Sequence, residues 1–353
     1  MSKNNYNVIG IMSGTSLDGI DLTYLNFTKN AKWNYEILAA ETIPYTREWE
    51  KTLAEAVFYN DLQLKELNEN YTNLLAEVIP GFLKRHKIKE IDAVCSHGHT
   101  VKHEPENSYT LQIGNLPQLA KKLGQKIVCD FRVQDVELGG QGAPLVPIGD
   151  ELLFPEYDYC LNLGGFANVS TRINNLRVAY DICPVNTVLN NLASRLNLAF
   201  DRNGEIAASG KIEPVLLEKL NSLDFYRQKP PKSLGIEWVN KHILPFFEDT
   251  ASVTSALKTY TVHAAEQIAR VLGKDPRQKV LVTGGGAFNT YLMEEIAKRT
   301  RVKVVIPSAE VINIKEALIF GFLGVLRLRN EINVLSSVTG ASRDHSSGQI
   351  YLP

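Results

Sequence analysis

Hydrophobic and polar residues alternate in short runs over the first part of the chain. Residues 7–12, 20–27 and 33–43 are rich in β-branched and aromatic side chains, and only short polar segments separate them. This pattern is typical of an antiparallel three-stranded meander. Residues 49–86 then carry apolar side chains at helical spacing, which predicts a helix. Further strands are expected over 91–98, 108–114 and 126–131, with a helix over 116–123 before the last of them.

The second half of the chain repeats this theme. A strand at 157–163, a glycine-rich turn, a strand at 169–173, an Asn-Asn hairpin turn and a strand at 176–182 are expected in succession. Later, a strand ending near Thr283 leads into a helix at 290–299, and a further strand follows at 302–307. Both halves therefore begin with a meander whose first turn is rich in glycine, which favours two related α/β domains.

The glycine-rich segment "LGGQGAPLVP" (138–147) interrupts the pattern and is interpreted as the crossing between the two domains. We therefore predict an N-terminal domain at 1–137 and a C-terminal domain at 138–333. The last residues, 334–353, are expected to pack back on the first domain.

Composition narrows the class of protein. The 353 residues carry a formal net charge of −1, which argues against a broad surface for nucleic acid or anionic membrane. The longest apolar run, 317–326, is too short to span a bilayer and predicts a buried helix. The first ten residues contain no apolar signal-peptide core, and the four cysteines form no CxxC pair. These features predict a cytoplasmic protein with reduced cysteines.

The first glycine-rich turn lies in "GIMSGTSLDGIDL" (10–22). It lacks the lysine of a P-loop, and a strand follows it where a P-loop or dinucleotide fold has a helix. Gly14, Thr15, Ser16 and Gly19 could still offer backbone N–H groups and hydroxyls to a phosphate. Asp18 would repel that phosphate unless Mg²⁺ lies between them. The alternative is that Asp18 and Gly19 only form a tight turn.

Two further glycine turns favour the phosphate-binding interpretation. "NLGGFAN" (162–168) could hold the same phosphates, and "TGGGAFN" (283–289) could let a nucleoside lie against bare backbone. Neither has the full GxGxxG spacing, so NAD binding is disfavoured. The residues expected to bind the nucleotide are Gly14, Thr15, Ser16, Asp18, Gly19, Asp21, Gly164, Gly165, Asn168, Gly284, Gly285, Gly286 and Asn289, and Asp18 is also the expected metal ligand.

Ten motifs occur in an order that resembles the anhydro-N-acetylmuramic acid kinase family, from about residue 8 to 352. They read "MSGTSLDGID", "SHGHTV", "LQIGN", "DFR", "LGGQGAPLVP", "NLGGFANVS", "PPKSLG", "TGGGAFN", "KEALIFGFLG" and "SVTGAS". The resemblance implies an α/β fold of the actin and sugar-kinase superfamily, with two ribonuclease H-like domains of mixed sheets and flanking helices around a central nucleotide cleft.

The resemblance also implies a reaction. Water opens the 1,6-anhydro bond of 1,6-anhydro-N-acetylmuramic acid, and the released 6-oxygen accepts the γ-phosphoryl group of ATP with Mg²⁺ present. The product, N-acetylmuramic acid 6-phosphate, belongs to cell-wall recycling. The expected partners are this amino sugar and ATP, with no nucleic acid and no membrane, and the resemblance implies a homodimer.

Five residues of the sequence match positions that serve the chemistry in the resembled family. Asp181, in "YDICPVN", matches the general base that activates water, and Glu316 matches a glutamate near the sugar. Arg132 is the expected clamp for the lactyl carboxylate, because a guanidinium matches a carboxylate bidentately. Thr100 and Asn186 are expected to line the sugar site. The alternative for Asp181 is a cap for the helix starting near Val185.

The chain departs from the family pattern at several of these motifs. Cys183 and Val185 replace two glycines around the base, Val133 replaces a second arginine, and Asn313 stands where an acid is common. These changes put the exact acceptor in doubt. "KPPKSLG" (229–235) is interpreted as a proline-rich surface loop without chemistry.

The segment "CSHGHTVKH" has a second interpretation. Cys95, His97 and His99 alternate along one face of an extended strand, and His103 lies nearby, so a soft metal could bind there. The alternative, which Gly98 favours, is a turn whose residues line the sugar site.

Three functions remain open from the sequence. The first is the anhydro-sugar kinase described above. The second is a kinase for another hexose or amino sugar on the same fold. The third is a degenerate, non-catalytic sensor of sugar or nucleotide, which the altered "DICPVN" and "DFRVQD" segments keep open.

Overall fold

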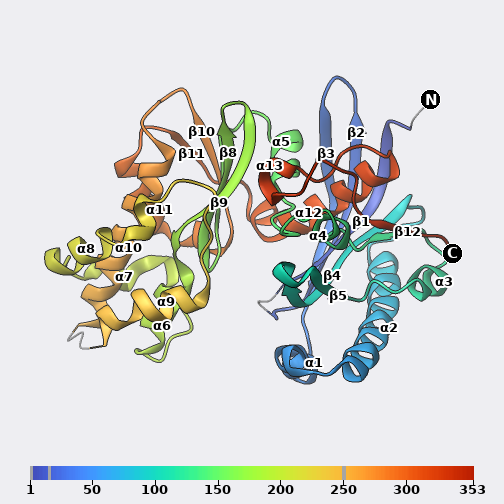
Figure 1. The fold of residues 1–353 in the computed structure, drawn as a ribbon, viewed down its shortest axis with the longest axis horizontal. Helices are drawn as coiled ribbons and strands as arrows, with labels where there is room; N and C mark the ends of the chain where they lie inside the picture. Colours follow the sequence, from blue (N-terminus) through green and yellow to red (C-terminus); the bar gives the residue numbers. More distant parts are fainter. Residues whose placement is uncertain (1–2, 15–16, 249–251) are drawn as a thin grey trace. The chain divides into compact units, whose positions relative to one another are not determined.

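The computed structural model describes residues 3–14, 17–248 and 252–353 and divides into two compact units (Figure 1). Unit 1 comprises Met1–Phe154 and Ile314–Pro353, and unit 2 comprises Pro155–Asn313. This division differs from the one predicted from sequence, because 138–154 and 314–333 belong to unit 1. The nucleotide cleft expected between the domains stays a prediction.

Unit 1 contains a mixed sheet with the order β12-β6-β4-β1-β2-β3, and β5 pairs with β4. The pairs β1–β2 and β2–β3 are antiparallel, whereas β1–β4 and β4–β6 are parallel. The C-terminal strand β12 pairs antiparallel with β6, so the last residues return to this unit. The strands are β1 (Asn5–Ser13), β2 (Ile20–Lys29), β3 (Trp33–Ile43), β4 (Ala93–Glu104), β5 (Tyr109–Ile113), β6 (Ile127–Cys129) and β12 (Gln349–Tyr351).

Helices cover both faces of this sheet, which explains why β1 is buried almost continuously. Ile9 and Ile11 pack into a cluster with α2, while Gly10, on the other face, lies against α12. A Cβ on Gly10 would lie 2.2 Å from the Ala317 carbonyl oxygen, so only glycine allows the helix to approach this closely. The helices are α1 (Arg47–Glu55), α2 (Asp61–Arg85), α3 (Gln118–Leu123), α4 (Val133–Glu137), α5 (Pro147–Leu153), α12 (Ala309–Leu328), which crosses the boundary between the units, and α13 (Ser336–Thr339), with 3-10 turns η1 (Ala56–Phe58) and η2 (Pro105–Asn107).

The helix predicted over 49–86 is two helices. Asn60 starts α2 with a capping box, in which its side chain accepts from the Gln63 N–H and the Gln63 side chain accepts from the Asn60 N–H. The helix predicted from the apolar run 317–326 is confirmed as the buried part of α12.

The segment 138–147 is anchored within unit 1 by the buried Asp135. The Asp135 carboxyl accepts from the Gly142 N–H at 2.7 Å and from the Thr339 hydroxyl at 2.7 Å, and the Gln141 N–H donates to the Thr339 carbonyl at 2.8 Å. His345 Nε2 lies 3.6 Å from the same carboxyl. The interpretation of 138–147 as a domain crossing is therefore wrong, because one fully buried side chain ties this segment to α13.

Unit 2 contains a sheet with the order β11-β10-β7-β8-β9. The pairs β7–β8 and β8–β9 are antiparallel, whereas β7–β10 and β10–β11 are parallel. The Asn-Asn turn between β8 and β9 has positive φ at Asn174 and Asn175, as expected for a tight hairpin. The strands are β7 (Tyr159–Leu163), β8 (Phe166–Ile173), β9 (Leu176–Pro184), β10 (Lys279–Thr283) and β11 (Lys303–Val305).

The core of unit 2 forms around α10, whose residues are buried along most of its length. It contacts α6, α7, α8, α11 and β9. The helices are α6 (Asn186–Ser194), α7 (Glu205–Ser209), α8 (Pro214–Asn221), α9 (Ile236–His242), α10 (Val253–Leu272) and α11 (Thr290–Arg299), with 3-10 turns η3 (Arg202–Gly204), η4 (Asp224–Arg227), η5 (Leu244–Phe247) and η6 (Gly285–Phe288).

The two sheets share one plan, which confirms the fold expected from the repeated sequence pattern. In each, a three-stranded antiparallel meander is extended by parallel strands on the side of its first strand: β3-β2-β1-β4-β6 in unit 1 and β9-β8-β7-β10-β11 in unit 2. Both units are thus α/β units with mixed sheets and flanking helices, the ribonuclease H-like arrangement.

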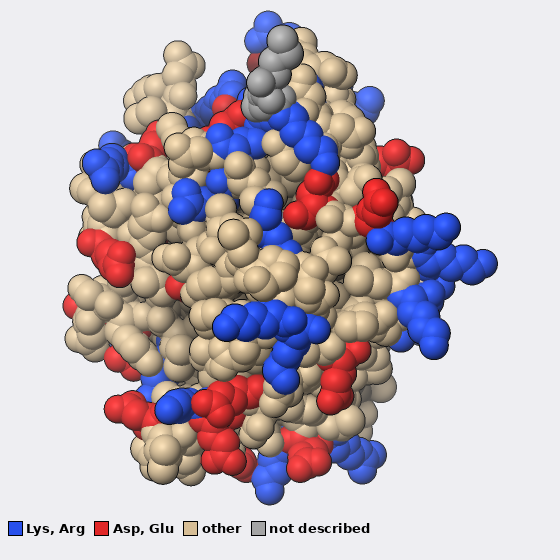
Figure 2. Space-filling view, turned by 90° about the vertical axis from the view of Figure 1, so that its right-hand side faces the viewer, with Lys and Arg blue, Asp and Glu red and all other residues tan. Residues whose placement is uncertain are grey.

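The surface carries charges of both signs. On the face in Figure 2, Lys and Arg lie among Asp and Glu with no broad field of one sign. In the part of the chain that the structure describes, no helix is both long and apolar enough to cross a membrane. The four cysteines are buried and form no disulfide.

Candidate functional site

The opening glycine turn connects β1 to β2 in unit 1. The Leu17 N–H donates to the Gly14 carbonyl at 3.3 Å, and Asp18 is exposed. Gly19 packs so closely that a Cβ would lie 2.4 Å from the Ile43 carbonyl oxygen. The adjacent end of β3 therefore requires glycine at position 19. Thr15 and Ser16, predicted phosphate ligands, lie outside the described residues.

Asp18 and Asp21 form an acidic pair next to this turn. The Asp21 carboxyl is half-buried and accepts from the Thr42 hydroxyl at 2.5 Å. Desolvation raises the pKa of Asp21, the hydrogen bond from Thr42 lowers it, and the negative charge of Asp18 raises it further. Two neighbouring carboxylates that repel each other fit Mg²⁺, which binds through one or two carboxylates, water and phosphate oxygens.

A buried hydrogen-bond chain below the turn was not predicted from the sequence. The Ser13 hydroxyl lies 2.5 Å from the Tyr45 hydroxyl and 2.9 Å from His99 Nδ1, and the Tyr45 hydroxyl lies 2.6 Å from that of Tyr71. Burial lowers the pKa of His99 to about 4, so this ring is neutral at physiological pH. The chain ties the end of β1 to α2 and fixes the base of the turn.

Arg132, the predicted carboxylate clamp, is held from two sides. Its Nε donates to His97 Nε2 at 2.9 Å, and its Nη1 donates to the Gly142 carbonyl at 2.5 Å. Burial lowers the pKa of Arg132 to about 10, while the charges of Glu316 and Asp135 counteract this. A guanidinium has five N–H donors, and the described residues accept from two of them, which leaves three for a ligand.

Glu316, Thr100 and Arg132 belong to the same unit. The Glu316 side chain is solvent-accessible, yet surrounding protein desolvates its carboxyl and raises its pKa, while Arg132 lowers it. The Thr100 hydroxyl accepts a long bond from Gln112 Nε2 at 3.4 Å. Gln112, which the sequence analysis did not single out, is buried, and its Oε1 has no hydrogen-bond partner among the described residues.

The soft-metal interpretation of "CSHGHTVKH" is wrong. His97 Nδ1 lies 2.9 Å from the Gly98 carbonyl and His97 Nε2 accepts from Arg132, so both nitrogens are occupied. His99 bonds Ser13, and His103 Nδ1 lies 3.0 Å from the Thr110 hydroxyl. Among residues 3–14, 17–248 and 252–353, no cluster of three or more His, Cys, Asp or Glu could hold a metal ion.

In unit 2, the glycine turn between β7 and β8 lies against the start of α6. The Gly165 carbonyl accepts from the Val185 N–H at 2.8 Å and from the Thr187 N–H at 3.2 Å. Asn186 Nδ2 donates to the Leu163 carbonyl at 3.3 Å. In the register of the sheet, Asn168 lies opposite Asp181. The structure therefore brings together residues from two sequence motifs. They are Gly164, Gly165 and Asn168 of the first motif and Asp181 and Asn186 of the second.

The third glycine motif packs against the second, within unit 2. A Cβ on Gly284 would lie 2.6 Å from Asn162 Oδ1, and one on Gly286 would lie 2.7 Å from Leu163 Cβ. Asn289 caps α11, because its Oδ1 accepts from the Leu292 N–H at 3.0 Å. Contact with β7 thus explains Gly284 and Gly286, and only Gly285 presents exposed backbone. Their role in nucleotide binding stays a prediction.

Asp181 lies within β9, next to a bulge. The register shifts between Ala167 and Asn168 of β8, so the pairs Ala167–Cys183 and Asn168–Asp181 leave Ile182 as the extra residue. Asp181 Oδ2 accepts from the Leu234 N–H at 2.8 Å and does not cap α6, so the capping alternative is wrong. Desolvation raises the pKa of Asp181, while the Leu234 N–H and Lys232 lower it.

Sequence reasoning missed the role of 229–235 and of Asp130. The loop 229–235 contacts Asp181 although 47 or more residues separate them, and its sequence carries no signal of that contact. Asp130 of "DFR" has positive φ, and burial followed by Glu137 raises its pKa to about 6. Asp130 therefore turns the backbone in the left-handed conformation two residues before Arg132.

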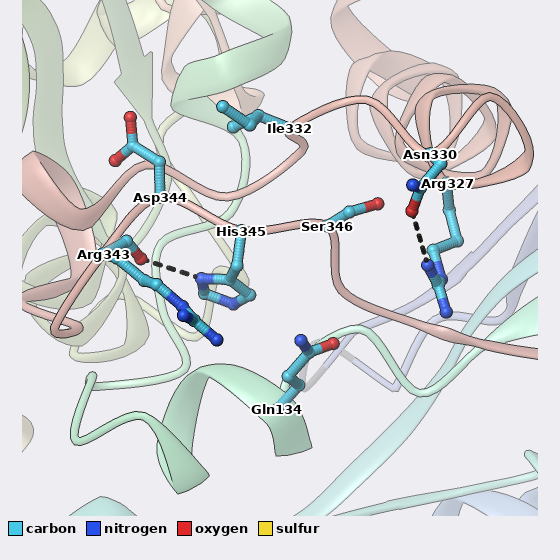
Figure 3. Close-up of a pocket in the computed structure, with 8 residues that line it drawn as sticks. All are labelled: Gln134, Arg327, Asn330, Ile332, Arg343, Asp344, His345 and Ser346. Carbon is cyan, nitrogen blue, oxygen red and sulfur yellow. Dashed lines mark hydrogen bonds between the residues drawn. The ribbon is translucent and has the colours of Figure 1, made fainter.

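A separate pocket of about 500 Å³ lies in unit 1, and no residue predicted for the site lines it. It lies between the C-terminal end of α12, α4 and the segment 343–346 (Figure 3). The His345 imidazole donates to the Arg343 carbonyl at 3.1 Å, and Arg327 donates to Asn330. The lining residues are Gln134, Arg327, Asn330, Ile332, Arg343, Asp344, His345 and Ser346.

Comparisons with known proteins extend over nearly the whole chain. A family model described as anhydro-N-acetylmuramic acid kinase matches residues 6–353. Curated proteins of that name from Mannheimia succiniciproducens and Pseudomonas syringae pv. tomato are 35% and 34% identical, over 99% and 97% of this chain and 100% and 98% of their own lengths. Among solved structures, a ROK family glucokinase from Streptomyces griseus in complex with glucose and AMPPNP covers 90% of this chain and 98% of its own, with 12% identity and a TM-score of 0.40.

Proposed function

The chain belongs to the anhydro-N-acetylmuramic acid kinase family, and we infer that it carries out that family's reaction, the coupled hydrolysis and phosphorylation of 1,6-anhydro-N-acetylmuramic acid. Water attacks the anomeric carbon, the bond from that carbon to O6 breaks, and O6 takes the γ-phosphoryl group of ATP. ADP leaves, and the water proton passes to a base. The product is N-acetylmuramic acid 6-phosphate, an intermediate of murein recycling.

The Asp181 carboxyl is the observation that carries this function. It is half-buried at a β-bulge, one oxygen is held by a backbone N–H, and desolvation raises its pKa. A carboxylate that is fixed and partly desolvated is a stronger base than an exposed one, and it suits removal of a proton from water. We therefore assign Asp181 as the general base.

Residues from each unit are assigned to ATP. The turn residues Gly14, Thr15, Ser16 and Gly19, and the residues Gly164, Gly165, Asn168, Gly284, Gly285, Gly286 and Asn289, are proposed to contact the nucleotide. Asp18, with Asp21 beside it, would hold Mg²⁺, which neutralises phosphate charge when it is bound. The coupling between the two carboxyls supports this assignment.

Four residues are assigned to the sugar. Arg132 is proposed to bind the lactyl carboxylate with the N–H donors that His97 and Gly142 leave available. Glu316 is proposed to act beside it on the sugar, where the electrostatic interaction between the two side chains supports a shared task. Thr100 and Asn186 are proposed to donate hydrogen bonds to the sugar.

Two departures from the family pattern, at Cys183 and Val185, are compatible with this activity. Cys183 and Val185 are fully buried, and the Cys183 thiol donates to the Ala264 carbonyl at 3.9 Å, so both side chains fill the core and not the space around Asp181.

We further propose a homodimer, which analytical ultracentrifugation would test.

The activity is tested by incubating the protein with ATP, Mg²⁺ and the anhydro sugar in ¹⁸O-water. We expect a sugar phosphate that carries one ¹⁸O at the anomeric carbon and none in the phosphoryl group, because water attacks carbon and not phosphorus. Mass spectrometry of early time points, with fragmentation, locates the label. A protein that phosphorylates an ordinary amino sugar and leaves the anhydro sugar intact would contradict this function.

Arg132→Lys should raise KM for the anhydro sugar by about tenfold or more, because an ammonium cannot replace a planar guanidinium that also bonds His97 and Gly142. The control is 1,6-anhydro-N-acetylglucosamine, which lacks the lactyl carboxylate. Steady-state kinetics on both sugars measures the effect. If KM rises equally for both, Arg132 does not recognise the carboxylate.

A further inference from the structure

Two hydrogen bonds join the loop 229–235 to Asp181, one to its backbone and one to its side chain. The Asp181 N–H donates to the Lys232 carbonyl at 3.1 Å, and the Leu234 N–H donates to Asp181 Oδ2 at 2.8 Å. The two bonds run in opposite directions between one strand residue and two loop residues. Such a pair fixes both the position of the loop on β9 and the orientation of the carboxyl.

Lys232 is itself held in place. Its Nζ donates to the Phe225 carbonyl at 3.1 Å and lies 4.4 Å from the centre of the Phe225 ring. Phe225 is buried and packs against Trp238, with ring centres 5.3 Å apart. The ammonium therefore has a fixed location, because a hydrogen bond and a cation–π contact both restrain it on a packed aromatic cluster.

The charges around Asp181 within unit 2 are few. Lys232, from the loop, lowers the pKa of Asp181. Burial lowers the pKa of Lys232 itself, while Cys183 and Asp181 counteract this. Cys183, on the same strand, is buried, and burial raises the pKa of its thiol so that it stays neutral. Asn168, opposite on β8, carries no charge. Among the described residues of this unit, Lys232 is thus the cation that acts on Asp181.

We propose that the loop 229–235 is a positioning element for the general base, in which the Leu234 N–H holds Oδ2 so that Oδ1 faces the water, and the Lys232 ammonium, fixed on Phe225, favours the charged carboxylate. This inference rests on the proposed function only for the identity of the reaction. Among the described residues no donor contacts Oδ1. Lys232 acts through Asp181 and touches no reacting atom, so it is a positioning residue.

The ionisation of Asp181 can be measured without any activity. Protein labelled with ¹³C at aspartate carboxyls is titrated by NMR, and the resonance missing from Asp181→Asn identifies Asp181. In Lys232→Met, the Asp181 titration should move to higher pH, because the nearby positive charge is lost. Lys232→Arg should restore it. Lys229→Met, an exposed lysine of the same loop, is the matched control and should leave it unchanged.

Kinetics provide the second readout. The acid limb of kcat/KM in Lys232→Met should move to higher pH together with the NMR titration, so that activity falls about three- to tenfold on the acid side and approaches wild type above the limb. A loss of the same size at every pH would indicate only a damaged fold. Thermal unfolding checks this, and Lys232→Gln replaces Lys232→Met if that variant does not fold.

The outcomes separate the inference from the proposed function. An Asp181 titration that is identical in wild type and Lys232→Met overturns the inference. A titration that moves while the acid limb stays in place shows that Lys232 acts on Asp181 and contradicts the assignment of Asp181 as the base.

Discussion

Asp181→Asn should lower kcat by about 10²- to 10⁴-fold, the range that a general base contributes. The asparagine oxygen can still accept from the Leu234 N–H, so the loop 229–235 keeps its contact with β9. What is lost is the ability to take a proton from water. A coupled assay for ADP release measures kcat, and calorimetry should show ATP binding close to that of wild type.

The matched control for this prediction is Asp224→Asn. Asp224 lies in η4 of the same unit, its side chain is 94% exposed, and its ion pair with Arg227 is 3.8 Å long at the surface. This variant should retain wild-type kcat. An Asp181→Asn enzyme whose kcat stays within about threefold of wild type would remove Asp181 from the mechanism.

Asp135→Ala should lower the free energy of unfolding of unit 1 by about 3–5 kcal/mol. The Asp135 side chain is fully buried, and its loss leaves the Gly142 N–H and the Thr339 hydroxyl without their acceptor. Each unsatisfied buried group costs about 1–3 kcal/mol, and the cavity adds to this. Urea unfolding in a Trp238→Phe background measures the change, because Trp33 and Trp49 then report on unit 1 alone.

Glu137→Ala is the control for this prediction. Glu137 is exposed on the same helix, α4, two residues after Asp135. Its replacement should change the unfolding free energy by no more than about 0.5 kcal/mol. Equal urea midpoints for Asp135→Ala and Glu137→Ala would show that the segment 138–147 is held by other contacts.

The periodicity of the sequence predicted the sheets well because their pairing is mostly local. Strands β1 to β3, and β7 to β9, follow one another along the chain, and short connections join them. The break before α2 was missed, although Asn60 and Gln63 have the spacing of a capping box. Local sequence patterns were therefore sufficient to predict the order of the strands in both sheets.

Contacts between distant residues could not be read from the pattern. Asp135 bonds Thr339, 204 residues away, and Asp181 bonds Leu234, 53 residues away. The first contact places 138–147 in unit 1, and the second places a loop without recognisable chemistry on the base. Gly284 and Gly286 are a further example. Close packing against β7, which is distant in the sequence, requires glycine at both positions.

The resemblance to a family supplied what periodicity could not. It pointed to Asp181 through "DICPVN", although two neighbouring glycines are replaced, and the structure gives those replacements buried positions in the core. It said nothing about the orientation of the carboxyl, which depends on the bulge in β8 and β9 and on the loop 229–235.

Unit 1 is built from two separate stretches of the chain, 1–154 and 314–353, so its parts are synthesised on the ribosome at different times. Strand β12 and most of α12 are translated after residues 155–313, so until then β6 lacks one of its two neighbours and the surface around Gly10 is uncovered. Residues 155–313 are continuous and emerge complete beforehand. Unit 2 can therefore finish folding before unit 1, although its synthesis begins later. Until residues 314–353 are made, the N-terminal part of unit 1 exposes apolar surface to which chaperones can bind.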